Sequence, residues 1–349
     1  MTESIEQVHQ RRVRYKGAYP KNYHEKYKEL QPEKYADELE KIKAKGKTPA
    51  GTHIPIMVEE ILEFLQIKPG MQGLDATLGY GGHTAKMLAC LQDKGHLLAI
   101  DVDSAELPKT ENRLRALGYG EDILTIKQSN FSEIGALAAE YGKFDFILAD
   151  LGVSSMQIDN PERGFSFKFD GPLDLRLNQS SGMTASERLF ELDEEDIAEM
   201  LINNSDEPYA AQIAKAIAKM QAGGVPIATT TQLKYIIANA LSFLPPQEKQ
   251  EAVKKSCQRT FQALRIDINS EYEVLEAFLE QLPNVLNDNG RAAILTFHSG
   301  EDRLVKKTFK RFYREGAFSQ IANEIVRPTK EECYQNPRAH STKMRWAIK

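Results

Sequence analysis

The 349-residue sequence predicts an α/β fold in which a mainly parallel sheet carries a helical insertion. Short apolar runs alternate with helical patterns along most of the chain, and several runs stop at glycines or carboxylates, whereas residues 184–255 carry helical patterns only. Strands buried on both faces of a parallel sheet appear as near-continuous apolar runs. We therefore expect a basic extension at 1–50, a sheet domain at 51–158 and 258–349, and a recognition loop with a helical insertion at 159–257.

The N-terminal extension differs in charge from the rest of the chain. Residues 1–50 contain twelve Lys and Arg against eight Asp and Glu, although the whole chain has a net charge of -5. Tyr15, Tyr19, Tyr23 and Tyr27 lie among these basic residues, a combination suited to phosphates and to unpaired bases. The alternative is an arm that packs along the body by its tyrosines, and the sequence leaves both open.

The first β-α unit contains a glycine loop. Helical spacing of apolar residues predicts a helix around residues 58–65, and residues 73–79 (GLDATLG) are typical of a strand that runs into glycines. The loop at residues 79–83 opens a helix over 84–91, and the next strand (HLLAIDVD) ends at Asp101. This layout suits a nucleoside whose ribose hydroxyls need an acceptor. The loop lacks GxGxxG spacing, which disfavours a dinucleotide.

The next units continue the β-α order. We expect a strand at 123–131, a helix at 136–141, and a buried strand that stops at Asp150. The carboxyl ends of parallel strands carry the ligand site, so Asp150 is a candidate functional residue. A turn-rich segment follows, in which Phe165, Phe167 and Phe169 stand at alternate positions. They either hold the loop on the core or grip a planar ligand.

The C-terminal part returns to the sheet. Helical patterns include Ala210, Ile213, Ile217 and Met220 in one segment and residues 233–241 in another. A later helix closes at 287–290, a buried strand at 291–297 ends at His298-Ser299, and a last strand lies near 345–348. The cleft between the insertion and the sheet edge would then lie over the ligand site.

Several classes of protein are disfavoured. Cys90, Cys257 and Cys333 are odd in number and far apart, so neither a disulfide framework nor a zinc site is indicated. We expect no metal, and the sequence leaves open only a magnesium ion held by carboxylates. The sequence has neither an apolar run long enough for a bilayer nor a signal peptide, so we expect no membrane association and a cytoplasmic protein. Nothing in the sequence fixes the oligomeric state.

Five motifs then carry a resemblance: DATLGYGGH, DLGVSSMQIDNPERGFSFKFDGPLDLR, RTFQALRI, FHSGEDR and NPRAHSTK. In this order they resemble the S-adenosylmethionine-dependent 16S ribosomal RNA cytosine-N4-methyltransferase family, also called MraW, over residues 52–349. The resemblance implies a Rossmann-like class I methyltransferase sheet with an inserted helical domain, S-adenosyl-L-methionine as cofactor, and a decoding-centre cytosine of the small ribosomal subunit as target. It implies these cofactor-binding residues: Gly81, Gly82, His83, Asp101, Phe131, Asp150 and Gln157.

The chemistry points to Asp150 as the catalytic candidate. The N4 amine of cytosine is a poor nucleophile, so an acceptor for its N–H groups that also orients it should matter more than a strong base. Asp150 either contacts the amine or serves only the cofactor, and we expect Asp75 to face the cofactor's amino group. The substrate-binding candidates are Arg163, Phe165, Arg259, His298 and Ser299, and Arg176, Arg265, Lys168 and Lys306 are further candidates for RNA phosphates.

The sequence also departs from the family pattern. Lys255-Ser256-Cys257-Gln258 replaces His-Pro-Ala-Thr, Gly300 replaces a leucine, and residues 1–50 are an addition. These departures resemble a divergent paralogous branch. The alternatives are an amino-methyltransferase of a different RNA or DNA base, and a non-catalytic ribosome-assembly factor of the same fold. A nicotinamide dehydrogenase would require GxGxxG spacing.

Overall fold

The computed structural model describes residues 55–349, which belong to one compact unit. The expected basic extension at 1–50 lies outside the described residues. Its proposed role therefore stays a prediction.

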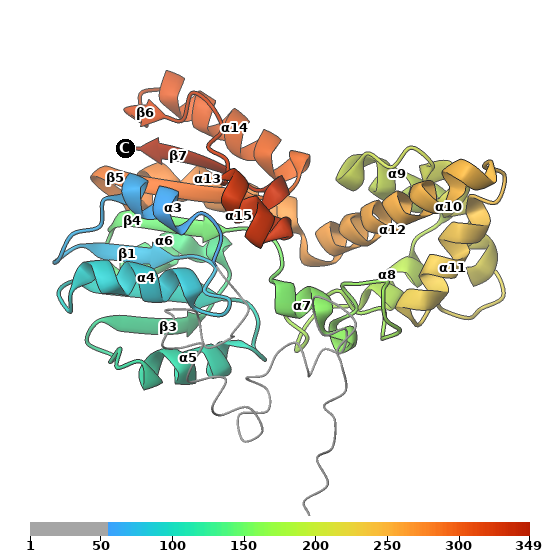
Figure 1. The fold of residues 1–349 in the computed structure, drawn as a ribbon, viewed down its shortest axis with the longest axis horizontal. Coiled ribbons are helices and arrows are strands. Elements are labelled where there is room, and N and C mark those ends of the chain that lie inside the picture. Colours follow the sequence, from blue (N-terminus) through green and yellow to red (C-terminus); the bar gives the residue numbers. More distant parts are fainter. Residues whose placement is uncertain (1–54) are drawn as a thin grey trace, which may run out of the picture. The chain divides into compact units, whose positions relative to one another are not determined.

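The described residues form a seven-stranded sheet in the order β3-β2-β1-β4-β5-β7-β6 (Figure 1). The neighbouring pairs from β3 to β5 are parallel, and β7 runs antiparallel to both β5 and β6. This confirms the predicted α/β fold. The strands are β1 (Gln72–Asp75), β2 (His96–Asp101), β3 (Leu124–Gln128), β4 (Phe144–Asp150), β5 (Leu286–Thr296), β6 (Gln320–Ile321) and β7 (Lys343–Ile348).

Helices cover both faces of the sheet (Figure 1). Alternate residues of a strand point to opposite faces, and here the side chains on both faces are apolar and are buried by helices. In β4, Ile147 packs in a cluster with α6, α13 and α14, whereas Phe146 and Leu148 pack with α3, α4 and α5. The sheet is thus buried on both sides. These helices are α3 (Val58–Leu65), α4 (Gly82–Leu91), α5 (Leu107–Ala116), α6 (Ile134–Tyr141), α13 (Glu271–Val285) and α14 (Ser299–Arg314).

Helix α5 was not predicted. Its sequence, LPKTENRLRA, is mostly polar, and only Thr110 and Leu114 are buried, so it shows no apolar periodicity. Strand β5 begins earlier than expected: residues 287–290, predicted to close a helix, lie inside it. The register shift between Phe144 and Phe146 marks the same irregular stretch of the β4–β5 pair.

Between β4 and β5 the chain forms a helical lobe with its own core. The buried residues of this core run from Phe165 to Leu264. Its helices are α7 (Ser155–Asp159), α8 (Ala185–Glu191), α9 (Glu194–Ser205), α10 (Ala210–Gln221), α11 (Thr230–Ala240) and α12 (Pro246–Asn269). The expected boundary at 257/258 falls within α12, a continuous helix that runs from the lobe towards the sheet domain. Met220, expected on the buried face, is 57% exposed.

Short elements complete the fold. They are the 3-10 turns Phe131–Glu133, Pro161–Arg163 and Pro337–Ser341, and α15 (Lys330–Gln335). Within residues 55–349, no helix combines the length and the apolar character needed to cross a bilayer.

Candidate active site

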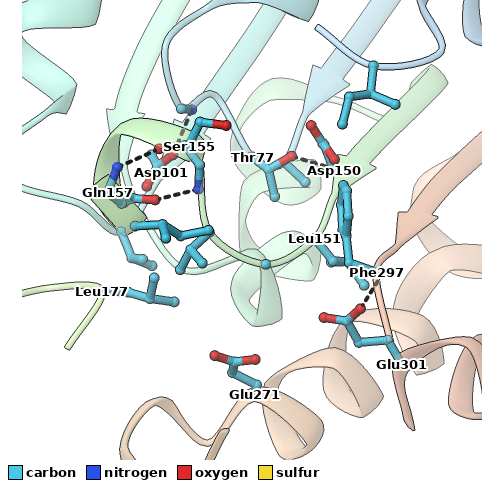
Figure 2. Close-up of a pocket in the computed structure, with 18 of the residues that line it drawn as sticks. Thr77, Asp101, Asp150, Leu151, Ser155, Gln157, Leu177, Glu271, Phe297 and Glu301 are labelled. Carbon is cyan, nitrogen blue, oxygen red and sulfur yellow. Dashed lines mark hydrogen bonds between the residues drawn. The ribbon is translucent and has the colours of Figure 1, made fainter. Parts of the chain in front are cut away.

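A cavity of about 490 Å³ opens at the carboxyl ends of the strands, within the size range of small-molecule sites (Figure 2). One part is lined by the segments that follow β1, β2, β3 and β4. The other part is lined by the end of α12, by the first residues of α13 and α14, and by the segment that follows β5. The cavity therefore lies where the notable motifs of the sequence meet.

The glycine loop after β1 is fixed by two carboxylates. Gly79 donates its backbone N–H to Asp101 Oδ2 at 2.7 Å. Asp75 accepts from the Thr84 hydroxyl at 2.6 Å and from the Thr77 N–H at 3.1 Å. Its side chain is buried and does not line the cavity, so the expectation that Asp75 faces the cofactor is wrong. Asp75 instead ties the loop to the first turn of α4.

The expected cofactor residues of this loop divide into two groups. Gly82 and His83 line the cavity, and Gly81 does not. Gly81 has a φ of 75°, and a Cβ there would lie 3.1 Å from side-chain carbons of Thr110 and Leu114. A side chain would thus strain the backbone and crowd α5, which gives Gly81 a role in shaping the loop.

Asp101, at the end of β2, lines the cavity. Besides the Gly79 contact, its Oδ1 accepts from the Asp103 N–H at 2.9 Å, and burial raises the pKa of the carboxyl. The neighbouring Asp103 was missed by the sequence analysis. Its Oδ2 accepts from Gln157 Nε2 at 2.8 Å and from Arg163 Nη1 at 2.6 Å, and so joins the end of β2 to α7 and to the recognition loop.

Asp150 ends β4 beside Thr77 (Figure 2). Its N–H donates to Thr77 Oγ1 at 2.7 Å, and its Oδ2 lies 3.5 Å from His83 Nδ1. Oδ1 is buried and has no hydrogen-bond partner among the described residues. Burial raises the pKa of this carboxyl to about 6, although the nearby His83 opposes that change. Asp150 therefore lines the cavity with a carboxylate, one oxygen of which is buried and has no partner among the described residues.

The structure contradicts the RNA-binding roles expected for two residues of the recognition loop, Arg163 and Phe165. Arg163 is buried and pairs with Asp103, and its Nη2 donates to the carbonyls of Arg176 and Leu177, so it is not available to a phosphate. Phe165 is buried in the core of the lobe. Phe167 packs edge-on against Phe261 with 5.6 Å between the ring centroids. These two phenylalanines hold the loop on the core.

The other candidates lie further along the chain. His298 lines the cavity, whereas Arg259 and Ser299 do not. The side chain of Arg259 is 38% exposed, and its Nη1 lies 3.9 Å from Glu207 Oε2 in the lobe. Phe131 and Gln157, which we expect to bind the cofactor, also line the cavity.

Two carboxylates of the second wall were missed as well. Figure 2 shows Glu271 and Glu301 on the side of the cavity opposite Asp101 and Gln157. Glu301 Oε2 accepts from the Phe297 N–H at 2.8 Å, and its Oε1 lies 3.1 Å from His298 Nε2. Glu271 pairs with Arg265. Possible ligand atoms of Glu271, His298 and Glu301 lie within 4.8 Å of one another, but both carboxylates already have protein partners, so we assign no metal to them.

The structure explains why glycine stands at position 300, next to the wall that carries His298 and Glu301. A Cβ at Gly300 would lie 1.9 Å from the Tyr272 hydroxyl, so the tyrosine occupies the space of a side chain at position 300. The Tyr272 hydroxyl donates to the Asn204 carbonyl at 3.3 Å, and Gln262 Nε2 donates to the same oxygen. Burial raises the pKa of Tyr272 to about 12, so this hydroxyl stays a donor.

The donor and acceptor set of the cavity fits a nucleoside with a cationic sulfonium group. The glycine loop keeps backbone close to the ligand, Asp101 offers a carboxylate after β2, Phe131 offers an aromatic face, and the partnerless oxygen of Asp150 offers negative charge. Together with the strand order, this site defines the class: an S-adenosylmethionine-dependent methyltransferase.

The chain belongs to the MraW methylase family, which matches residues 50–349. A protein of Lachnoclostridium phytofermentans, named Ribosomal RNA small subunit methyltransferase H 1, is 62% identical over 348 residues, which cover 100% of this chain and 95% of that protein. Ribosomal RNA small subunit methyltransferase H of Methylobacillus flagellatus is 38% identical over 312 residues, 84% of this chain and 94% of its own. Among solved structures, an rRNA methylase from Streptococcus thermophilus is 12% identical, and the match covers 84% of this chain and 93% of that chain. Its TM-score is 0.38, which is too low to support any conclusion.

Proposed function

We propose that this protein transfers the methyl group of S-adenosylmethionine to the exocyclic N4 amine of a cytosine in the decoding centre of 16S rRNA. The family and the names of its relatives support a ribosomal RNA of the small subunit as substrate. The observation that carries the proposal is the partnerless Oδ1 of Asp150, which lies at the end of β4 between the two parts of the cavity.

Binding of the cofactor is assigned to the first part of the cavity. Asp101 accepts hydrogen bonds from ribose hydroxyls, Phe131 contacts the adenine, and Gly82 and His83 lie along the methionine part. Gln157 closes the same side from α7, where its amide is already held by Asp103. The bound cofactor supplies an activated methyl group.

Asp150 then acts on the amine. Its carboxylate accepts a hydrogen bond from the N4 amine and directs the nitrogen lone pair towards the methyl carbon. A carboxyl whose pKa is about 6 is mostly ionised above neutral pH, so it is ready to accept this bond. Positioning of this kind lowers a barrier by about 7 to 11 kcal/mol in favourable cases. The proton leaves easily once the nitrogen is alkylated, which makes a strong base unnecessary.

The partner of the reaction is the small ribosomal subunit or its 16S rRNA, and the place of action is the cytoplasm. The sequence-based role of residues 1–50, a basic grip on RNA, agrees with such a partner but lies outside the described residues.

A direct test uses ribosomal subunits as substrate. The purified protein is incubated with methyl-labelled S-adenosylmethionine and with small subunits from a strain that lacks its gene, and the RNA is digested to nucleosides. We expect label in N4-methylcytidine. Label in another nucleoside, or in DNA offered in parallel, would refute the substrate, and tight S-adenosylhomocysteine binding without any transfer would favour an assembly factor.

A further inference from the structure

The wall formed by α12, α13 and α14 has no part in the proposed cofactor site. Its polar side chains are Gln262, Arg265, Asn269, Glu271, His298 and Glu301. The proposed cofactor residues follow strands β1 to β4, whereas His298 follows β5, which pairs with β4 on the side away from β1. A target base that meets Asp150 at the end of β4 therefore has this wall as its other boundary.

Arg265 is the only arginine of this wall, and one edge of its guanidinium is bound by the carboxylate of Glu271. Its Nε donates to Glu271 Oε1 at 2.7 Å and its Nη2 to Glu271 Oε2 at 2.8 Å. The side chain is only 14% exposed. Among residues 55–349, Nη1 has no hydrogen-bond partner, although Arg265 lines the cavity. The outer edge of the guanidinium, with Nη1 and the second hydrogen of Nη2, thus offers two parallel donors to a ligand.

The neighbouring carboxylates keep the Arg265 guanidinium protonated. Burial alone would lower the pKa of the guanidinium, but the carboxylates of Glu271 and Glu301 outweigh this effect and raise it. Glu301 is itself kept ionised: burial opposes its charge, yet His298 and Arg265 lower its pKa. The donors of Arg265 therefore have a fixed direction and a fixed protonation state.

We propose that Arg265 is the specificity-determining residue that selects cytosine over uracil, and that Glu271 is the positioning residue that aims it. The inference rests on the proposed function. Cytosine presents one donor, the N4 amine, beside two acceptors, N3 and O2. Asp150 matches the amine, and the outer edge of Arg265 matches the two acceptors.

Uracil reverses this pattern. It carries a donor at N3 and an acceptor at O4, so its N3–H would face the donors of Arg265 and its O4 would face the carboxylate of Asp150. A site whose buried polar groups are left facing like groups rejects the wrong ligand strongly. A bidentate arginine contact with a base discriminates by roughly tenfold or more. Reading of an unpaired base by its Watson–Crick edge is the usual mode for single-stranded RNA.

The test measures base preference separately from methyl transfer. The full-length protein is saturated with S-adenosylhomocysteine and titrated with cytidine 5′-monophosphate or uridine 5′-monophosphate, with binding followed by NMR line broadening. We expect the wild-type protein to prefer the cytidine nucleotide by roughly tenfold or more. Arg265→Lys keeps a charge for Glu271 but lacks the two-donor edge, so the preference should fall to within about twofold.

Further variants test whether Glu271 orients the Arg265 side chain or only stabilises the fold. Glu271→Gln should weaken the preference, and Glu271→Asp should restore part of it, while S-adenosylhomocysteine affinity stays unchanged in all three variants. The matched control is Arg188→Gln. Arg188, on α8, forms a 2.8 Å ion pair with Asp267, which lies on α12 like Arg265, and neither residue of this pair lines the cavity. This control variant should leave the preference unchanged.

Two results would overturn the inference: a wild-type protein without cytidine preference, or an Arg265→Lys protein that retains it. The proposed function fails by a different observation, namely the absence of N4-methylcytidine in RNA treated with the wild-type enzyme.

Discussion

Replacing Asp150 by asparagine should make the protein more stable, whereas Asp150→Ala, which removes the acceptor, should make it inactive. The side chain is 24% exposed, and one of its oxygens is buried without a partner. Burial raises the pKa from 3.8 to about 6, so the folded state holds the proton more tightly than the unfolded chain does. At about 1.36 kcal/mol for each tenfold change in proton affinity, the ionised carboxylate costs at most about 3 kcal/mol of folding free energy at neutral pH.

The pH dependence of this effect has a definite sign. A group with a raised pKa in the folded state destabilises the protein once pH rises through the window from 3.8 to about 6, and contributes no cost below that window. Asparagine has the same shape and no charge. The stability difference between Asp150→Asn and wild type should therefore approach 3 kcal/mol at pH 7.5 and shrink towards zero near pH 4.

The assay is guanidinium unfolding of both proteins, without cofactor, at pH 7.5 and pH 4. Single-turnover methyl transfer is measured alongside with Asp150→Ala, and we expect this variant to lose at least about a hundredfold in rate, because it removes the acceptor that positions the amine. Wild-type activity should fall as pH drops below about 6, where Asp150 becomes protonated. A stability difference that does not change with pH would refute the burial argument, and an Asp150→Ala protein with near wild-type rate would refute the catalytic role.

Three further predictions concern the cofactor, the extension and the second wall. Asp101→Ala should weaken S-adenosylmethionine binding by about 1 to 3 kcal/mol in calorimetry, because it removes a charged acceptor from the cavity; unchanged affinity in a folded variant would contradict the assignment. Deletion of residues 1–47, predicted from sequence alone, should raise the RNA dissociation constant and flatten its salt dependence without changing cofactor affinity; a lower melting temperature with unchanged RNA binding would instead assign the extension to packing. Gly300→Leu should destabilise the protein by about 1 to 3 kcal/mol in denaturant unfolding through overpacking against Tyr272. Adding Tyr272→Ala should recover part of that loss, and a double variant no better than the single one would argue against the contact.

The sheet was predictable because its strands are short apolar runs that end at chemically distinct residues. The run before Asp150 and the run before Asp101 both appear as strands with those carboxylates at their ends. Helix α5 was not predictable in this way, since most of its surface is exposed and its sequence contains no apolar stripe. Periodicity detects only the elements that bury one face.

The candidate site was predictable only in part. Strand ends placed Asp101 and Asp150 at the cavity, but the partner of a charged residue distant in sequence leaves no local signal. Arg163 resembled a phosphate ligand until the structure paired it with Asp103, sixty positions earlier. Asp75 stands at a strand end like Asp101, yet the Thr84 hydroxyl faces it and removes it from the cavity.

The contact between Tyr272 and Gly300 restricts which substitutions this chain can accept. With the tyrosine in place, the leucine of the usual motif cannot return at position 300, because the hydroxyl already fills the site of its Cβ. Loss of the tyrosine alone would leave a void behind His298 and remove a donor from the Asn204 carbonyl. The two positions are therefore expected to be exchanged as a pair.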